Sequence, residues 1–469
     1  MLFNSLEFLF FLPLVFTLYW FIFNKRLSWQ NALVLVASYF FYGWWSWKFM
    51  GLLMLSTLLD YTYGFSVASP NRKKAKFFLW LSIINNLGIL GIFKYYNFFA
   101  VQFQEGLELL GLHTNPVLLN IALPVGISFY TFHGMSYVFD IYRRQQKPVK
   151  NFIDYAVFVS FFPLLVAGPI ERASHLLPQV QKPRVFNSEI ATSGISLMIW
   201  GFFKKVVVAD NLAPGVNDVF ANYYELDSIS LLLGGVYFAF QIYCDFSGYS
   251  DIARGTAKLF GFELLKNFDN PYMSSSIPEF WKKWHMSLTR WFRDYLYFPL
   301  GGSKVGFIKS LRNVFLVFII SGFWHGANLT YVFWGLIHAL FYIPSFIKKW
   351  KNITILQHDV KMFRILGIVQ TFITTTLAWI YFRSASIYDA NKYIIRLFTP
   401  SNYNLELFSW RSSTTDGSHV EFLFILILFW IFWRVYQAKY FVIRNAFLIV
   451  SILFFGMYFK ATDFIYFQF

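Results

Sequence analysis

Apolar runs of membrane-spanning length recur along the whole chain and constrain its fold more than any other feature. The runs include FLFFLPLVFTLYWFIF at 8–23, VFLVFIISGFW at 314–324 and FLFILILFWIFW at 422–433. A helix of about 20 apolar residues crosses a bilayer because it bonds its backbone polar groups internally. No polar stretch is long enough to build a soluble core, and only 14% of the 469 residues are charged. The sequence therefore predicts an all-α polytopic membrane protein that forms a single domain over 1–469.

Basic residues predict how the chain is oriented in the membrane. The formal net charge is +16, and Lys and Arg gather at 24–26, 72–74, 143–150, 348–351 and 439–444. Because Lys and Arg are enriched in cytoplasmic loops, we place each cluster in the cytoplasm. The first span then starts outside, at a segment that lacks the features of a removable signal. No basic cluster lies on a soluble face, which excludes a nucleic-acid-binding function.

This orientation gives a consistent alternation of spans. We expect spans at 6–23, 30–47, 50–68, 77–97 and 119–140, and four spans or partial spans over 152–262. Five more are expected at 312–328, 329–346, 362–382, 421–438 and 442–460. The last span runs outward, so the polar loop 398–419 and both chain ends are predicted to lie outside the cytoplasm.

Two stretches do not have the composition of plain spans. Residues 278–304 mix aromatic and basic side chains, and one helical face collects Trp284, Leu288, Trp291 and Tyr295. This pattern predicts one amphipathic helix at the cytoplasmic interface, ended by a Pro and a Gly-Gly turn. Residues 166–179 carry two prolines together with Glu, Arg and His side chains, which predicts a re-entrant or cavity-lining segment.

His325 is the strongest candidate for a catalytic residue. It lies in the apolar stretch SGFWHGANLTYVFWG (321–335), where an ionisable side chain is costly and needs a partner. Gly322 and Gly326 would allow a substrate or another helix to approach closely, and Asn328 would lie one helical turn away. The reference pKa of imidazole suits a general base near neutral pH. The alternative is a histidine that bridges two helices, and the residues alone leave both interpretations open.

The remaining polar residues receive structural or secondary roles. His285, on the expected interfacial helix, is either a headgroup-level anchor or a second polar residue on the rim of the same cavity. Arg293 and Asp294 are expected to pair with neighbours. Asp245 and Asp251 are expected to pair with basic residues or to cap broken helices rather than to bind a metal.

Other histidines and the single cysteine are expected to be structural. His338 should pack near His325 from the next span, and His133 should pack between helices, whereas His419 lies in a loop or at a membrane edge without an assigned role. One cysteine, Cys244, allows neither an intrachain disulfide nor a cysteine metal site. Glycine-rich nucleotide loops, a GxSxG serine motif and an HxxxxD motif are missing from the sequence. We therefore expect neither a metal nor a bound cofactor.

Five stretches together resemble one known family. They are SFYTFHGMSYVFDIYR (128–143), FFPLLVAGPIERASHLLPQ (161–179), YCDFSGYSDIARG (243–255), FWKKWHMSLTRWFRDYLYFPLGG (280–302) and SGFWHGANLTYVFWG (321–335). In this order they resemble the membrane-bound O-acyltransferase (MBOAT) family, over nearly the whole chain. The resemblance is to its bacterial polysaccharide O-acetyltransferase branch, which includes the membrane subunits for alginate and peptidoglycan O-acetylation and the teichoic-acid D-alanyl transferase.

The resemblance implies a ring of about 11–14 transmembrane or partial helices around a central tunnel, with interfacial helices. It implies that His325 is the catalytic histidine and His285 the second, cytoplasmic-side histidine. Residues expected to line the tunnel or contact substrate are Trp324, Asn328, Trp284, Asp294 and Arg293. The donor is expected to be cytosolic acetyl-CoA. The acceptor is an envelope polysaccharide reached through a periplasmic SGNH-type partner, which places the protein in a bacterial cytoplasmic membrane.

The last seven residues, DFIYFQF, resemble the terminal motif of the small partner peptide in teichoic-acid D-alanylation. There the tyrosine is proposed to accept the acyl group, so the resemblance implies that role for Tyr466, within an extracytoplasmic motif at 460–469. An interfacial aromatic belt is the simpler alternative. At the level of the whole protein, a polysaccharide or solute transporter and a scaffold for an envelope complex are the competing hypotheses. The sequence does not name the polysaccharide, and it leaves a short acyl group other than acetyl open.

Overall fold

The computed structural model describes residues 1–166, 168–351, 360–399, 417–436, 441–458 and 465. Every regular element in these ranges is a helix, and they contain no β-strand. Six helical segments in the described ranges are long and apolar enough to cross a membrane: 72–109, 188–221, 228–259, 307–325, 329–350 and 361–383. The predicted class, an all-α polytopic membrane protein, is confirmed.

The described residues pack as two compact units. Unit 1 comprises Met1–Ile195 and Ala253–Leu265, and unit 2 comprises Ser196–Ile252 and Lys266–Phe469. The helices α10 (Ser188–Phe202) and α12 (Ser228–Leu259) each contribute residues to both units. The single domain expected from the sequence stays a prediction.

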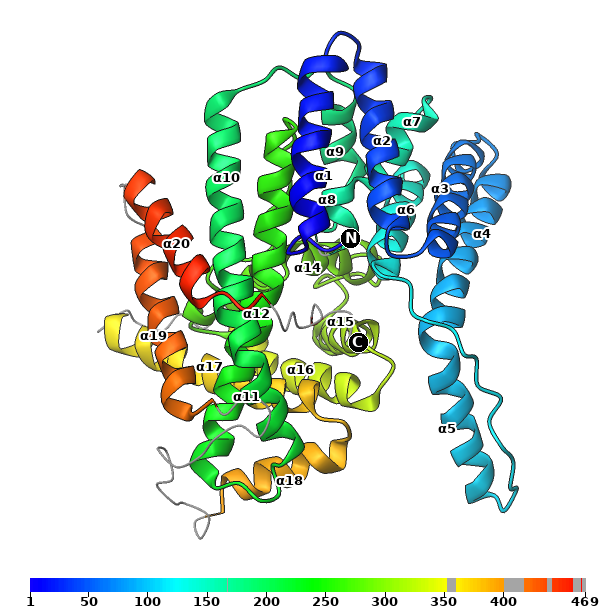
Figure 1. Ribbon diagram of the computed structural model, residues 1–469. Coiled ribbons are helices and arrows are strands. Elements are labelled where there is room, and N and C mark those ends of the chain that lie inside the picture. The colour runs from blue at the N-terminus through cyan, green and yellow to red at the C-terminus, as the bar shows by residue number, and fades with distance from the viewer. Residues whose placement is uncertain (167, 352–359, 400–416, 437–440, 459–464, 466–469) are drawn as a thin grey trace. The chain divides into compact units, whose positions relative to one another are not determined.

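Unit 1 is built mainly from the first nine α-helices (Figure 1). Its elements are α1 (Leu6–Thr17), η1 (Leu18–Ile22), α2 (Leu27–Gly43), α3 (Trp47–Val67), α4 (Arg72–Leu90), η2 (Gly91–Tyr95), α5 (Tyr96–Leu109), α6 (Ile127–Tyr142), α7 (Phe152–Ser160), α8 (Phe162–Leu165) and α9 (Ala173–Val180). Asparagine side chains start two of them, since Asn71 accepts the N–H of Lys73 at 3.0 Å and Asn151 accepts that of Ile153 at 2.9 Å. Such caps satisfy N–H groups that have no partner inside the helix.

Two predicted spans of unit 1 have wrong boundaries. The span expected at 119–140 becomes helical only at Ile127, after Pro124 and Gly126. Gly126 has a φ of 72°, and a Cβ there would lie 2.0 Å from the carbonyl oxygen of Leu165, so the chain turns before it becomes helical. The span expected at 77–97 is longer, because α4, η2 and α5 form one helical segment over 72–109 that extends beyond the other helices of the unit (Figure 1).

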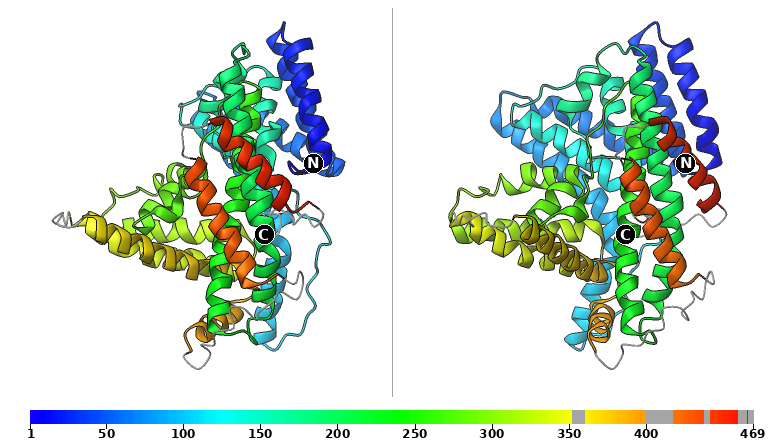
Figure 2. Two further views of the ribbon diagram at one scale, coloured as in Figure 1. Left: turned by 60° about the vertical axis from the view of Figure 1, so that its left-hand side comes forward. Right: turned by 90° about the vertical axis from the view of Figure 1, so that its left-hand side faces the viewer.

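Unit 2 contains the later helices. Its elements beyond α10 and α12 are η3 (Phe203–Ala209), α11 (Asp210–Ala221), η4 (Pro271–Met273), α13 (Ile277–Lys283), α14 (Met286–Phe292), η5 (Arg293–Tyr297), α15 (Phe307–His325), α16 (Leu329–Trp350), α17 (Val360–Arg383), α18 (Ile387–Leu397), α19 (His419–Tyr436) and α20 (Phe441–Phe455). Figure 2 shows α19 and α20, in orange and red, alongside the segment formed by η3 and α11. The amphipathic helix α18 was not expected from the sequence.

Two buried lysines pair with the acidic residues of α12 inside unit 2. The Nζ atom of Lys204 lies 2.6 Å from a carboxylate oxygen of Asp251. The Nζ atom of Lys205 lies 2.7 Å from Asp245 and 2.9 Å from Asp210. The expected pairing of Asp245 and Asp251 with basic residues is confirmed. These pairs join η3 to α11 and α12, because removing one partner would leave a buried charge without compensation.

The antiparallel pair α15 and α16 packs closely at two glycines. A Cβ at Gly322 would lie 2.2 Å from the carbonyl oxygen of Tyr331, and one at Gly335 would lie 2.3 Å from that of Phe318. No side chain fits at either position, so the two backbones can approach only because both residues are glycine. The expected approach of another helix at Gly322 is confirmed.

We predict that Gly335→Ala destabilises the protein, because its Cβ would overlap the backbone of α15. Overpacking of this kind costs about 1–3 kcal/mol, and the melting temperature in detergent should fall by several degrees. The matched control is Gly88→Ala in α4, where a Cβ meets nothing within 4 Å. There the higher helix propensity of alanine should contribute about 1 kcal/mol. An unchanged melting temperature for Gly335→Ala would contradict the packing.

Candidate active site

His325 is the last residue of α15, at the corner that leads into α16. Gly326 is extended, with φ −163° and ψ 156°, and Asn328 is the N-cap of α16. The expected helical spacing between His325 and Asn328 is therefore wrong. The amide oxygen of Asn328 accepts the N–H of Thr330 at 3.0 Å, and its nitrogen donates to the carbonyl of Ala385 at 2.9 Å. Its expected contact with substrate stays a prediction.

His285 lies at a break in the expected interfacial helix. The single helix predicted over 278–304 is wrong, since α13 ends at Lys283 and α14 begins at Met286. His285 has a left-handed backbone, with φ 41° and ψ 54°. The preceding segment holds this conformation, because the carbonyl of Asn267 accepts the N–H of Met286 at 2.9 Å. A non-glycine residue in this region is strained, and such strain is often kept at functional sites.

Three histidines of unit 2 lie in one cluster of aromatic side chains. The ring centres of His285 and Trp324 are 6.0 Å apart, and those of Trp324 and His325 are 4.9 Å apart. Trp334 continues the series, with its ring 5.1 Å from His325 and 5.0 Å from His338. We call this group the histidine–aromatic cluster; its members are His285, His325, His338, Trp281, Trp284, Trp324, Trp334, Trp379 and Phe382.

The cluster is closed to solvent. His325 is 3% exposed and His285 is fully buried. Trp284 and Trp324 are also buried and belong to the cluster. The predicted position of His338 near His325 is confirmed, and its Nδ1 atom accepts the indole N–H of Trp281 at 3.3 Å. A site lined in this way excludes water, and a low dielectric strengthens hydrogen bonds to a bound reactant.

Burial keeps the ring of His285 uncharged. This residue does not belong to any of the helical segments long enough to span a membrane. Loss of hydration lowers the pKa of His285 to about 3. Its ring is therefore neutral at physiological pH and can donate one N–H. Arg293 and Asp294, by contrast, pair with each other at 2.8 Å on η5, where Arg293 is half exposed. Their predicted pairing is confirmed, whereas their expected contact with substrate stays a prediction.

Tyr466 lies outside the described residues, but the residue before it is described. Ile465 is 3% exposed, and its backbone N–H donates to the carboxylate of Asp245 at 2.7 Å. The next residue of α12, Phe246, has its ring 4.7 Å from that of His285. The backbone of Ile465 is therefore hydrogen-bonded to Asp245, and the next residue in α12, Phe246, contacts His285 of the histidine–aromatic cluster.

His419 is a buried polar residue to which the sequence assigned no role. His419 was expected in a loop or near a membrane edge, and the structure places it, fully buried, as the first residue of α19. Its Nε2 atom lies 2.9 Å from the hydroxyl of Ser230, and its Nδ1 atom lies 3.2 Å from that of Tyr237. Both partners belong to α12, so His419 links two helices. The contact is long-range, and no local pattern in the sequence indicates it.

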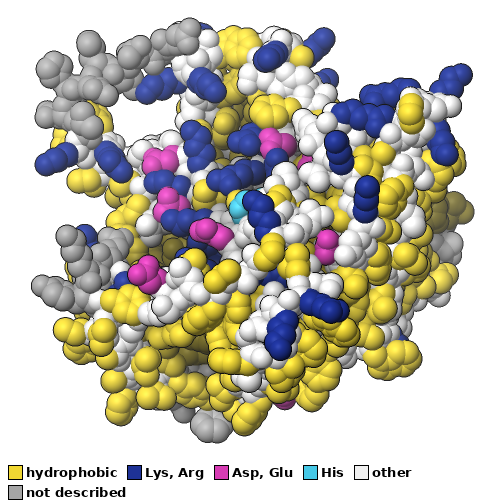
Figure 3. All heavy atoms as spheres, turned by 90° about the horizontal axis from the view of Figure 1, so that it is seen from above, with side chains coloured by type: hydrophobic (Ala, Val, Ile, Leu, Met, Phe, Trp, Pro, Cys, Tyr) yellow, Lys and Arg dark blue, Asp and Glu magenta, His cyan; other side chains and the backbone are white. Residues whose placement is uncertain are grey.

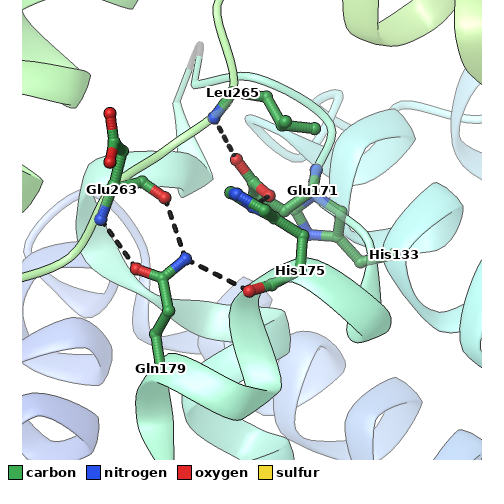
Figure 4. Close-up of polar contacts among 6 residues, drawn as sticks. All are labelled: His133, Glu171, His175, Gln179, Glu263 and Leu265. Carbon is green, nitrogen blue, oxygen red and sulfur yellow. Dashed lines mark hydrogen bonds and ion pairs between the residues drawn. The ribbon is translucent and has the colours of Figure 1, made fainter.

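Glu171 organises a second polar group, in unit 1 (Figure 4). Its side chain is fully buried; one carboxylate oxygen accepts the Nδ1–H of His175 at 2.7 Å and the other accepts the N–H of Leu265 at 2.6 Å. Its backbone N–H donates to Nε2 of His133 at 3.0 Å. Residues 166–179 were expected to differ from a plain membrane span. Within this stretch, residues 168–172 are irregular and α9 follows them. The predicted packing role of His133 is confirmed.

Gln179 completes this group on α9. Its amide nitrogen donates to the carbonyl of Glu263 at 3.0 Å, and its amide oxygen accepts the N–H of Glu263 at 2.8 Å. The hydrogen bond to Glu171 raises the pKa of His175 above its ordinary value. All of these contacts bind the segment 263–265 to α9. The group therefore has a structural role within unit 1, and both carboxylate oxygens of Glu171 already accept hydrogen bonds from the protein.

No group of His, Cys, Asp and Glu in the described ranges could hold a metal ion. Cys244 is fully buried and behaves as a small apolar residue. The histidine–aromatic cluster thus offers imidazole groups in an apolar setting. This arrangement suits proton transfer and hydrogen bonding to a reactant inside a polytopic membrane protein.

These features define a polytopic helical membrane protein with a buried cluster of histidines, and comparisons with known proteins identify its family. Residues 33–390 match the model of MBOAT, the membrane-bound O-acyltransferase family. The chain belongs to this family and is an acyltransferase. Its five quoted stretches were sufficient to predict the family correctly.

Curated relatives include three kinds of bacterial enzyme. The chain is 38% identical over 408 residues to a probable alginate O-acetylase AlgI of Pseudomonas syringae, covering 86% of this chain and 76% of that protein. It is 35% identical over 423 residues to a peptidoglycan O-acetyltransferase of Helicobacter pylori, covering 84% and 79%. It is 30% identical over 270 residues to a teichoic acid D-alanyltransferase of Bacillus subtilis, covering 54% and 67%.

We predict that the left-handed backbone of His285 can be detected by substitution. Both His285→Gly and His285→Ala remove the imidazole, but only glycine adopts this conformation without strain. Non-glycine residues lose about 1–2 kcal/mol there. The glycine variant should therefore have the higher melting temperature of the two in detergent. Equal melting temperatures would contradict the left-handed turn between α13 and α14.

Proposed function

We propose that this acyltransferase moves an acetyl group from cytosolic acetyl-CoA across the bacterial cytoplasmic membrane to Tyr466. An extracytoplasmic SGNH-type partner then passes the group to an envelope polysaccharide. No resident cofactor takes part, and acetyl-CoA is the donor substrate. The observation that carries the proposal is the hydrogen bond from the backbone N–H of Ile465 to Asp245. Phe246, the next residue in α12, contacts the ring of His285.

Contacts within unit 2 between Ile465 and the residues around His325 support this proposal. Asp245 accepts the N–H of Ile465, and Phe246, its neighbour in α12, contacts the ring of His285. The ring of His285 faces Trp324, which precedes His325 in α15. A phenol one residue beyond Ile465 is therefore a reasonable acceptor for chemistry at the histidine–aromatic cluster.

The chemistry requires a base, because a phenol with an ordinary pKa of about 10 is protonated at neutral pH. His325 would take the phenol proton as the oxygen attacks the thioester carbonyl. When the tetrahedral intermediate collapses, the carbon–sulfur bond breaks and the coenzyme A sulfur takes that proton from His325. The products are an acetyl ester of Tyr466 and free coenzyme A, so the donor thiol never needs to cross the membrane.

His285 would stabilise the oxyanion rather than act as the base. Its pKa of about 3 makes the ring a weak base but leaves it an uncharged N–H donor. Preorganised donors of this kind, in a site without water, contribute several kcal/mol to the transition state. Trp284 and Trp324 would shape the space around the acyl group. The aryl ester that forms is more reactive than a sugar ester, so transfer to a hydroxyl would be downhill.

The names of the relatives support the class of acceptor. Alginate and peptidoglycan are the polymers named for two of them, and both are envelope or extracellular polysaccharides. We therefore propose an extracytoplasmic polysaccharide for this chain. The distribution of basic clusters supports chain ends outside the cytoplasm, where Tyr466 could meet a partner enzyme. A D-alanyl group, as named for a third relative, is the alternative acyl group.

We predict that His325→Ala abolishes acetyl transfer whereas His338→Ala does not. Both variants remove a buried imidazole from the histidine–aromatic cluster, so both lose packing. Only the first loses the base, which contributes about 10²–10⁴-fold. The assay uses purified full-length protein with radiolabelled acetyl-CoA, and folding is checked by size-exclusion chromatography. Normal transfer by His325→Ala, or equal losses in the two variants, would contradict the assignment.

We also predict that Asp245→Ala impairs transfer to the tail more than Asp251→Ala does. Each variant removes one carboxylate of α12 that pairs with a buried lysine. Only Asp245 also accepts the N–H of Ile465, so its loss releases the tail. Labelling of the C-terminal peptide should fall at least tenfold relative to the matched control. If both variants label the tail equally, Asp245 does not position it.

A further inference from the structure

Unit 1 contains a basic pocket, whereas the histidine–aromatic cluster belongs to unit 2. Its volume is about 230 Å³, and it is formed by η1, the segment between α9 and α10, and the end of α12. Trp20 and Phe186 contribute aromatic walls, and Lys182, Arg184 and Lys258 contribute three cations. All of these residues belong to unit 1. The proposed function does not use this pocket.

The three cations lack carboxylate partners. Within the described ranges, none of them forms an ion pair, in contrast to Lys204 and Lys205. The Nζ atom of Lys258 donates to the hydroxyl of Ser193 at 3.2 Å. A group of cations that the protein does not neutralise favours an anion from outside.

Arg184 is held in place by neutral groups. Its guanidinium donates to the hydroxyl of Tyr19, to the carbonyls of Gln179 and Val180 at 3.2 and 3.0 Å, and to the amide oxygen of Asn31 at 2.5 Å. These bonds fix its orientation without removing its charge. Asn31 also donates to Asp154 at 2.9 Å, so this carboxylate is linked to Arg184 through the Asn31 side chain. Arg184 is therefore a preorganised cation, suited to an oxyanion.

The start of α10 adds to the positive potential. Asn187 lines the pocket and caps the helix, accepting the N–H of Ile190 at 3.0 Å. The N-terminal end of a helix carries a partial positive charge and favours phosphate groups. The field of this helix end and the charges of Lys182, Arg184 and Lys258 therefore act on the same small space.

The edge of the pocket is apolar and exposed. Val185 is 84% exposed and Phe186 is 49% exposed, directly after Arg184 in the chain. Figure 3, which views the molecule from above Figure 1, shows many Lys and Arg side chains on this face, with several Asp and Glu side chains among them. Cations next to exposed apolar side chains are typical of the headgroup region of a membrane. Lysines that only set the orientation of the chain in the membrane would be scattered over the cytoplasmic surface. Such lysines would not need a pocket built around an arginine held in one orientation.

We propose that this pocket binds a phosphate group, supplied by the headgroup of an anionic phospholipid. Basic pockets between helices on the cytoplasmic side bind such headgroups in membrane proteins. The volume is below the range of about 300–1,000 Å³ typical of sites for drug-sized ligands. It therefore suits a phosphate with a glycerol group better than a nucleotide. Val185 and Phe186 would lie against the acyl chains.

The test uses the full-length protein in a zwitterionic detergent. Native mass spectrometry follows the binding of phosphatidylglycerol, of phosphatidylcholine as the zwitterionic comparison, and of coenzyme A and inorganic phosphate as soluble phosphates. The variant is Lys182→Gln with Lys258→Gln. The matched control is Lys73→Gln with Lys76→Gln, which removes two exposed lysines of α4 that do not line the pocket. Lys182 is exposed, so its single variant serves if the double variant does not fold.

We expect phosphatidylglycerol to bind more tightly than phosphatidylcholine. The pocket variant should weaken phosphatidylglycerol binding about 30-fold, since each of the two cations that it removes contributes about 1 kcal/mol near a membrane surface. The control should match the unmodified protein. Equal affinity for both lipids, or equal losses in the two double variants, would overturn the proposal. Displacement of phosphatidylglycerol by coenzyme A or phosphate would also overturn it, because the occupant would then be a soluble phosphate.

Discussion

The packing of both units depends on one constraint: a charge buried among apolar helices must find its partner inside the protein. An ion moved into a low-dielectric interior loses several kcal/mol of hydration. Lys205 meets this cost with Asp210 and Asp245, and these contacts set how η3, α11 and α12 can lie. In unit 1, the buried Glu171 is bonded to His175 and to the backbone of Leu265. The buried carboxylate of Asp245 likewise finds a second partner inside the protein, because it accepts the N–H of Ile465 in addition to pairing with Lys205.

The histidine–aromatic cluster follows from close packing of apolar groups. Gly322 and Gly335 let the backbones of α15 and α16 touch, which brings Trp334 of α16 against His325 of α15. His338 lies one helical turn after Trp334 on α16, and their rings are in contact. His285 reaches the same cluster from another direction, at the left-handed turn between α13 and α14. Together these features exclude water around the imidazoles, and a dry, preorganised setting makes weak donors effective.

Features set by local pattern could be predicted from the sequence, and those set by distant contacts could not. Long apolar runs indicated the membrane helices, and the acidic residues 245 and 251 in an apolar, glycine-broken stretch were expected to pair with basic residues or to cap broken helices. The continuous interfacial helix was wrong because Asn267, which precedes the amphipathic stretch in the chain, holds the backbone turn at His285 through the N–H of Met286. The buried position of His419 depends on Ser230, nearly two hundred residues earlier in the chain. Neither contact has a periodic signature.

The central claim is that the acyl group passes through the tail of this chain. Peptide mapping by mass spectrometry tests it most directly, after purified protein has reacted with acetyl-CoA in the absence of an acceptor. The account predicts one acetyl ester on the C-terminal peptide, located at Tyr466 and sensitive to hydroxylamine. The ester should be missing from a Tyr466→Phe variant of equal stability. An unmodified tail in protein that still transfers acetyl groups to its acceptor would contradict the account.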